Sequence, residues 1–91
     1  MPLQIIFKTE AQQDIIDALY WYESKRKGLV EEFLNEVLKD AEYIRLNPLA
    51  FPMKLKEMRE FVMKRFPYLI IYKIEKENIV VFAVFNTWQH P

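Results

Sequence analysis

Hydrophobic side chains recur at spacings of three and four residues through the first half of the chain. Between positions 11 and 22 they are Ala11, Ile15, Ala18, Leu19 and Tyr22. This spacing predicts a helix with one buried face, because an α-helix turns every 3.6 residues. We expect Thr9 to be its N-cap, with Gln12 completing a capping box, and Gly28 to stop it.

A second stretch with the same period runs over residues 29–46. Its apolar side is formed by Val30, Phe33, Leu34, Val37, Leu38, Ala41 and Ile44. Most of its charged side chains are expected on the opposite, solvent-facing side: Glu31, Glu32, Glu36, Lys39, Asp40 and Glu42. Asn47-Pro48 ends the helix, because a residue before proline disfavours helical angles. The short link at Gly28 predicts an antiparallel helical hairpin.

The remaining segments have the shorter period of strands. Residues 3–7 form a short apolar strand, and a loop follows over 47–57. Residues 59–65 alternate between two faces, which is typical of a strand, and Phe66-Pro67 bends the chain. Residues 68–74 are rich in β-branched and aromatic side chains, and 75–78 form a hairpin turn. Residues 79–85 are apolar on both faces, which predicts a central strand covered on both sides.

The predicted order is β-α-α-β-β-β within one domain over residues 1–91. It indicates an α+β fold of two layers, with the helical hairpin on one face of a four-stranded, mainly antiparallel sheet. We expect the first strand to pair with the last, because its backbone groups would otherwise lack partners.

The inventory of reactive side chains is small. The chain of 91 residues has no cysteine, one glycine, one histidine (His90) and one serine (Ser24). These counts exclude a disulfide framework, a cysteine-ligated metal, a glycine-rich phosphate loop and a two-histidine metal site. The start of the chain lacks the features of a signal peptide, and no apolar run approaches the roughly 18–20 residues of a membrane helix. We therefore expect a cytoplasmic protein without cofactor or metal.

The net charge of zero conceals an uneven distribution. Residues 1–50 carry six basic and nine acidic side chains, a net of −3, whereas residues 51–91 carry seven basic and four acidic ones, a net of +3. The densest basic cluster comprises Lys54, Lys56, Arg59, Lys64 and Arg65. Two interpretations stay open. The cluster is either a solvated strand edge that resists edge-to-edge pairing, or a surface for an acidic partner or nucleic acid.

Aromatic side chains also allow two interpretations. Tyr20, Trp21 and Tyr22 are consecutive on a helix, so at least one must point away from the core. That side chain either lies at the rim of the core or forms a contact with another protein. Trp88 near the end of the chain is either an anchor that covers the sheet or part of a contact surface. His90 could serve as a general acid or base, although nothing in the sequence positions it.

The order of elements and several local phrases resemble the RelE/ParE toxin superfamily, in particular its ParE-like branch, whose members are often labelled plasmid stabilisation proteins. The resemblance covers essentially the whole chain. The phrases that carry it are Ala11 with Asp14-Ile15, Tyr20-Trp21-Tyr22, Phe33 with Val37, Ile44 with Asn47-Pro48, Phe51-Pro52, Arg59, Phe66-Pro67-Tyr68, Ile71-Tyr72, and the run from Val80 to Phe85.

The resemblance implies the toxin component of a bacterial type II toxin–antitoxin module. Such a toxin is held inactive by a cognate antitoxin, usually encoded beside it. RelE-like members cleave mRNA on the ribosome through basic side chains, whereas ParE-like members poison DNA gyrase. The positions of the four RelE-type cations are taken here by Glu60, Val62, Leu69 and Gln89. We therefore expect action by protein binding, with DNA gyrase as the candidate target.

The last six residues depart from the family's usual C-terminal phrase, His-x-x-Arg-x-Pro. They are Asn86, Thr87, Trp88, Gln89, His90 and Pro91. The expected functional surface comprises Arg59, Lys64, Arg65, Asn86, Trp88, Gln89 and His90, with no metal site. Two alternatives remain: a ribosome-dependent mRNA endoribonuclease that uses Lys64, Arg65 and His90 in an offset arrangement, and a non-toxic relative that only binds an antitoxin.

Overall fold

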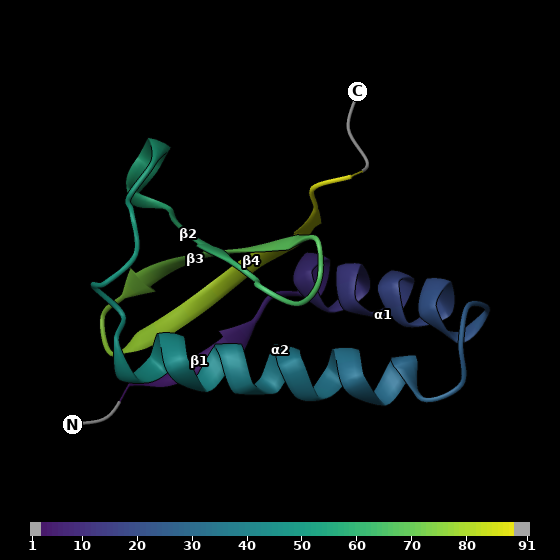
Figure 1. Cartoon of the computed structure of the whole chain (residues 1–91). Coiled ribbons are helices and arrows are strands. Elements are labelled where there is room, and N and C mark those ends of the chain that lie inside the picture. Colours follow the sequence, from purple (N-terminus) through teal and green to yellow (C-terminus); the bar gives the residue numbers. More distant parts are fainter. Residues whose placement is uncertain (1–2, 89–91) are drawn as a thin grey trace.

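The order of elements is the predicted one. In a computed structural model, which describes residues 3–88, the chain runs through β1 (Gln4–Phe7), α1 (Thr9–Glu23) and α2 (Leu29–Leu46). A short 3₁₀ turn, η1 (Leu55–Glu57), interrupts the connection to β2 (Arg59–Val62), and β3 (Tyr68–Glu75) and β4 (Asn78–Asn86) complete the fold (Figure 1).

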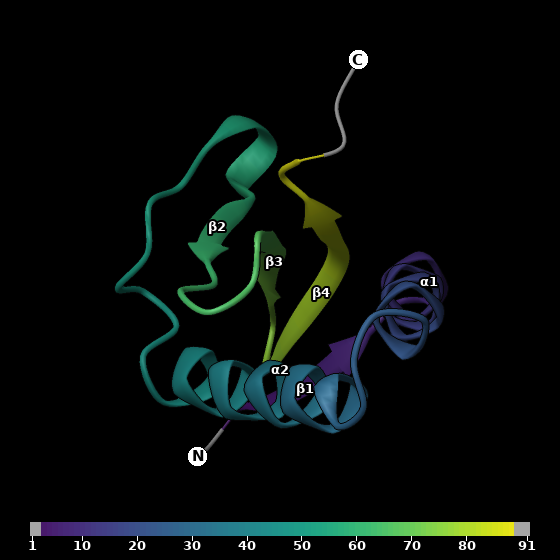
Figure 2. The same cartoon turned by 45° about the vertical axis from the view of Figure 1, so that its right-hand side comes forward.

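The four strands form one mixed sheet in the order β1-β4-β3-β2. Strand β1 pairs with β4 in parallel, and the other two pairs are antiparallel. The expected pairing of the first and last strands is therefore confirmed. Both helices contribute to a single buried cluster with the inner face of β3 and β4, so helices and sheet make two layers (Figures 1 and 2).

Four aromatic rings join the two helices to the sheet. Phe33 of α2 is fully buried, and its ring centroid lies 5.2 Å from Tyr22 of α1, 5.1 Å from Phe66 and 5.1 Å from Tyr68. These tilted and edge-to-face contacts suit the charge distribution of aromatic rings. The cluster fixes the turn between β2 and β3 against the ends of both helices.

The ends of α1 differ from the prediction. The N-cap is Lys8, Thr9 already belongs to the helix, and the Gln12 side chain donates a hydrogen bond to the Phe7 carbonyl at 2.9 Å. The helix ends at Glu23, five residues before Gly28, so Gly28 does not stop it. Gly28 is instead the N-cap of α2, where its φ of 86° explains why glycine is needed.

Two expectations for the strands were also inexact. Strand β2 ends at Val62 rather than at position 65, because residues 63–66 turn toward the helices and bury Met63 and Phe66. Strand β4 is central as predicted, but its second face is not fully covered. Helices occupy only one side of the sheet, and a β-bulge near Ile71 places Val84 inside while Phe85 is exposed.

Candidate functional site

Part of the predicted functional surface comes together at one end of the sheet. Lys64 and Arg65 lie in the turn between β2 and β3, and Asn86 to Trp88 end β4 and the segment after it. Pro67 joins the two segments: its carbonyl accepts hydrogen bonds from the Thr87 amide at 2.8 Å and the Thr87 hydroxyl at 3.0 Å. Gln89 and His90 lie outside the described residues.

Arg59 belongs to a different region. Its guanidinium donates to the Phe51 carbonyl at 2.7 Å and to the Leu49 carbonyl at 3.5 Å. The neighbouring Tyr72 hydroxyl donates to the Pro48 carbonyl at 2.6 Å. These bonds attach the loop after α2 to the sheet. The guanidinium therefore binds backbone oxygens. Arg59 begins β2, whereas Lys64 and Arg65 lie in the turn beyond the other end of this strand.

The end of β4 combines a buried polar contact with an exposed ring. The Asn86 amide donates to the Tyr68 hydroxyl at 3.3 Å, and its side-chain oxygen accepts the Trp88 amide hydrogen at 2.8 Å. Burial raises the pKa of Tyr68, so this hydroxyl is neutral at pH 7. Trp88 is 78% exposed. The alternative in which Trp88 covers the sheet is therefore wrong, and its ring is available to a partner.

Two carboxylates expected on the solvent side of α2 are buried instead. Glu36 lies under Arg65, with 3.8 Å between its carboxylate and the guanidinium, and Asp40 is 7% exposed. Burial and the charge of Glu36 raise the pKa of Asp40 to about 6, although Lys39 and Lys64 act in the opposite direction. The expectation followed the charge of these residues, whereas Asp40 has the helical spacing of the buried Phe33, Val37 and Ile44, and Arg65 of the β2–β3 turn lies against Glu36.

We expect Asp40→Asn to stabilise the protein at neutral pH. The raised pKa means that the folded chain holds the Asp40 proton more tightly than the unfolded chain, so the carboxylate costs stability above pH 6. A rise of the Asp40 pKa from 3.8 to about 6 lowers the free energy of unfolding by about 3 kcal/mol where the carboxylate is ionised. This penalty disappears below pH 4, where the group is protonated in both the folded and the unfolded chain. Since a buried amide has its own desolvation cost, the expected gain in unfolding free energy is about 1–2 kcal/mol at pH 7.

Denaturant unfolding at pH 7 and at pH 4 measures this gain. Glu31→Gln is the matched control, because Glu31 is an exposed carboxylate on the same helix and its replacement should change stability little. A gain in the Asp40→Asn protein that is equal at both pH values would contradict the assignment of the penalty to the ionised Asp40.

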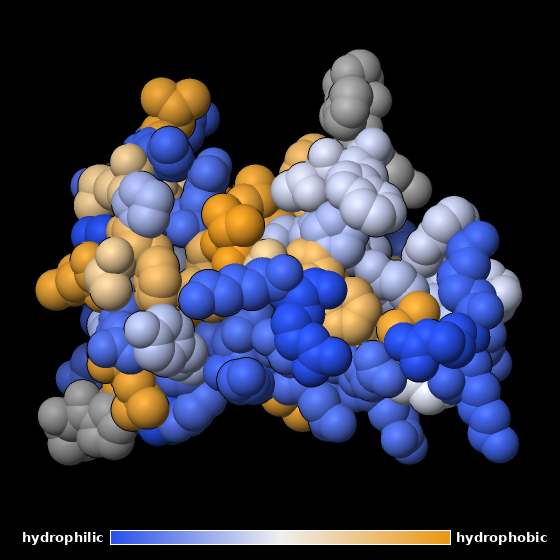
Figure 3. Space-filling model, in the orientation of Figure 1, coloured by the Kyte–Doolittle hydropathy of each residue, from blue (hydrophilic) through white to orange (hydrophobic). Residues whose placement is uncertain are grey.

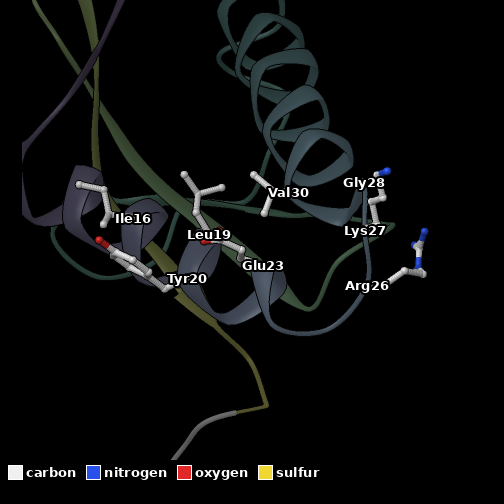
Figure 4. A pocket seen from close by; sticks show the side chains of 8 residues that line it. All are labelled: Ile16, Leu19, Tyr20, Glu23, Arg26, Lys27, Gly28 and Val30. Atoms are coloured by element: carbon white, nitrogen blue, oxygen red, sulfur yellow. The ribbon is translucent and has the colours of Figure 1, made fainter.

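A groove between the two helices was not anticipated as a unit. Near the hairpin connection it encloses about 720 Å³, lined by Ile16, Leu19 and Tyr20 of α1 and by Val30 of α2 (Figure 4). A second hollow of about 620 Å³ adjoins it at Ile16 and continues to Leu38 and Ile6. Tyr20 is 72% exposed, whereas Tyr22 is buried, which confirms that the three consecutive aromatic residues divide between core and surface.

Within residues 3–88, no three His, Cys, Asp or Glu side chains gather closely enough to hold a metal ion. In the same part of the chain, neither helix combines the length and apolar character needed to cross a membrane.

Comparison with known families decides the assignment. The family model described as the ParE toxin of the type II toxin–antitoxin system, parDE, matches residues 5–90. The chain belongs to the ParE toxin family. The resemblance drawn from the sequence is therefore confirmed, and with it the type II toxin class. A search of curated protein sequences found no match to this ParE-family chain.

Solved structures share the fold of this ParE-family chain at low sequence identity. A chromosomal ParDE system from P. aeruginosa matches with a TM-score of 0.75 and 15% identity, over 92% of this chain and 95% of that one. The RelBE2 toxin–antitoxin complex of Mycobacterium tuberculosis matches with a TM-score of 0.57 and 16% identity, over 94% of this chain and 99% of that one. A conserved hypothetical protein of Helicobacter pylori matches with a TM-score of 0.60 and 21% identity, over 96% of this chain and 97% of that one. At these identities, the likeness supports the two-layer fold.

Proposed function

We propose that this protein is a toxin that acts by binding a cellular protein, with DNA gyrase as the target, and that a cognate antitoxin neutralises it. The observation that carries the proposal is the ParE family match over residues 5–90. Two of the structural neighbours are described as toxin–antitoxin systems, which supports an antitoxin as partner.

The groove between α1 and α2 is the proposed docking site of the antitoxin. Its apolar part exposes the large side chains Ile6, Ile16, Tyr20 and Leu38, whereas charged side chains line its hairpin end. An amphipathic helix can lay its apolar face in such a groove and bury these side chains. Lys27 at the hairpin end of the groove is placed to pair with an acidic residue of that helix, beside Arg26, which is paired with Glu32 at 3.3 Å (Figure 4).

The end of the sheet formed by the β2–β3 turn and the end of β4 is the proposed contact with the target. Lys64 and Arg65 supply positive charge there, and Asn86 and Trp88 supply polar and aromatic contact area. Gln89 and His90 follow directly in the sequence and are proposed to extend this surface. Arg59 is proposed to contribute by holding the loop after α2 in place, given its bonds to the loop carbonyls.

The outer sheet face favours binding over RNA cleavage. Three of the positions that correspond to RelE-type cations lie close together on it, because Val62 is directly opposite Leu69 and Glu60 is opposite Ile71. These side chains are acidic or apolar. A phosphoryl-transfer site needs cations aimed at the developing negative charge, and this part of the face does not provide them.

We expect the double variant Lys64→Ala/Arg65→Ala to relieve growth inhibition by at least tenfold in colony counts while the protein stays folded. Both side chains are exposed, but Arg65 lies 3.8 Å from the buried Glu36 carboxylate, so the variant should lose some stability. Circular dichroism and the soluble level of the variant show that it is still folded in the growth assay. Lys54→Ala/Lys56→Ala is the matched control, because it removes two exposed cations from another region. Equal toxicity of the wild type and the Lys64/Arg65 variant would contradict the proposed surface.

Two assays on purified components separate the candidate targets. Inhibition of DNA supercoiling by gyrase, lost in the Lys64/Arg65 variant, is the result expected here. Codon-specific cuts in ribosome-bound mRNA, mapped by primer extension, would instead support the nuclease alternative. Antitoxin binding without any effect on growth would identify a non-toxic relative.

A further inference from the structure

A second groove lies between α2 and the edge strand β2, on the side of α2 away from α1. It encloses about 620 Å³. Its apolar lining comes from Tyr43 and Leu46 of α2, Phe51 of the following loop, and Phe61 and Val62 of β2. Figure 3 shows orange side chains over the loop that follows α2, beside blue ones over α2 and the β2–β3 turn (Figure 3).

The aromatic floor of this α2–β2 groove is firmly built. The ring of Phe51 lies 4.8 Å from that of Phe61 and 5.7 Å from that of Tyr43, and the Tyr43 and Phe61 centroids are 6.2 Å apart. Arg59 reinforces the floor by donating to the Phe51 carbonyl at 2.7 Å. These ring contacts and the Arg59 hydrogen bond attach the loop after α2 to β2 and form the floor of the groove.

One wall of the groove carries an unsatisfied acid. Asp40 is more than nine-tenths buried, and its Oδ2 has no hydrogen-bond partner among the residues that the structure describes. A buried polar atom without a partner is rare in folded proteins and calls for an explanation such as a ligand. No cation within residues 3–88 lies at ion-pair distance from Asp40. Lys39 and Lys64 act on its carboxylate only by longer-range electrostatic attraction.

The charges around Asp40 leave room for a cation from outside. Glu36 shares the wall and is opposed by Arg65 at 3.8 Å. Glu42 is paired with Arg45, while Glu60 of β2 adds another carboxylate to the lining. Lys39 and Lys64 are exposed at the rim. Glu36 and Glu42 therefore have arginine partners, whereas Asp40 and Glu60 have no ion-pair partner among residues 3–88 and face only the two rim lysines. The buried Asp40 can thus receive one basic side chain from outside.

We propose that the α2–β2 groove binds a segment of the antitoxin in which an arginine or a lysine lies between apolar side chains, and that Asp40 receives the cation. The antitoxin as the source of this segment rests on the proposed function, whereas the chemistry of the segment follows from the groove. Tyr43, Phe51 and Val62 contact its apolar side chains. This site is separate from the groove between α1 and α2, so a partner that occupies both encircles α2.

Blocked pentapeptides that contain Leu-Arg-Leu or Leu-citrulline-Leu test the proposal on the full-length, ¹⁵N-labelled protein. Citrulline keeps the shape of arginine and removes its charge. The arginine peptide should shift the amide signals of Asp40, Tyr43 and Val62, and should bind at least tenfold more tightly than the citrulline peptide. Asp40→Asn should abolish this preference, and lowering the pH from 7 to 5 should weaken it.

Three results would overturn the proposal: no binding at millimolar peptide, equal binding of both peptides, or shifts confined to Ile16 and Tyr20 in the other groove. The comparison of peptides on the wild-type protein is decisive even if Asp40→Asn alters the fold, which its own spectrum reveals. A growth assay of the same protein separates the two proposals. If the toxin arrests growth but the peptides fail, only the α2–β2 site is wrong; if the chain never arrests growth, the toxin function is wrong whatever the peptides do.

Discussion

Replacing Phe33 by alanine is expected to lower the free energy of unfolding by about 3–5 kcal/mol. Phe33 is fully buried, and its ring contacts Tyr22 of α1, Phe66 of the β2–β3 turn and Tyr68 of β3. Its removal leaves a cavity where the two helices meet the sheet, and the surrounding aromatic rings are too constrained to close it. Such a loss is a large share of the stability of a chain of this size.

Chemical denaturation followed by circular dichroism measures the effect. Leu38→Ala is the control, because it removes a large apolar side chain from the same helix at a position that is 63% exposed, and it should cost less than about 1 kcal/mol. Comparable losses in the two variants would show that the aromatic cluster is not the centre of the core.

The double variant Ile16→Ala/Tyr20→Ala is expected to weaken binding of the antitoxin by about 30-fold or more. Both residues line the groove between α1 and α2 and are exposed in the free toxin, so their burial would occur only in the complex. Large exposed side chains that become fully buried are typical hot spots, and a combined contribution of about 2 kcal/mol corresponds to this 30-fold change. The toxin's own stability should change little, because neither side chain is in the core.

Calorimetric titration with the protein encoded beside this one gives the affinity directly. Leu49→Ala/Leu55→Ala is the control, because these leucines are also exposed but lie in the loop after α2 and in η1, away from the groove. If the groove variant binds like the wild type, the antitoxin docks elsewhere on the molecule.

The sequence predicted most of the architecture because that depends on local periodicity. The helical spacing of Val30, Phe33 and Val37 placed α2 correctly over Leu29–Leu46, and the change to a period of two located the strands. The start of α1 was misplaced because Thr9 can be either the cap or the first helical residue, and only the backbone angles at Lys8 distinguish these.

The functional surfaces were less predictable because they depend on which elements meet in space. Asp40 has the helical spacing of the buried residues Phe33, Val37 and Ile44, and its charge alone suggested the solvent side. Arg59 was expected to present its charge to a partner, but its guanidinium lies against carbonyls some ten residues earlier in the chain. Periodicity within one element contains no information on such contacts between elements.

Growth of bacteria that express this protein alone tests the central claim most directly. The account predicts that induction of the soluble wild-type chain stops growth, and that co-expression of the protein encoded beside it restores growth. The Lys64→Ala/Arg65→Ala variant at the same soluble level should be much less toxic. Unimpaired growth of cells that contain soluble, folded wild-type protein would contradict the conclusion that this ParE-family member acts as a toxin.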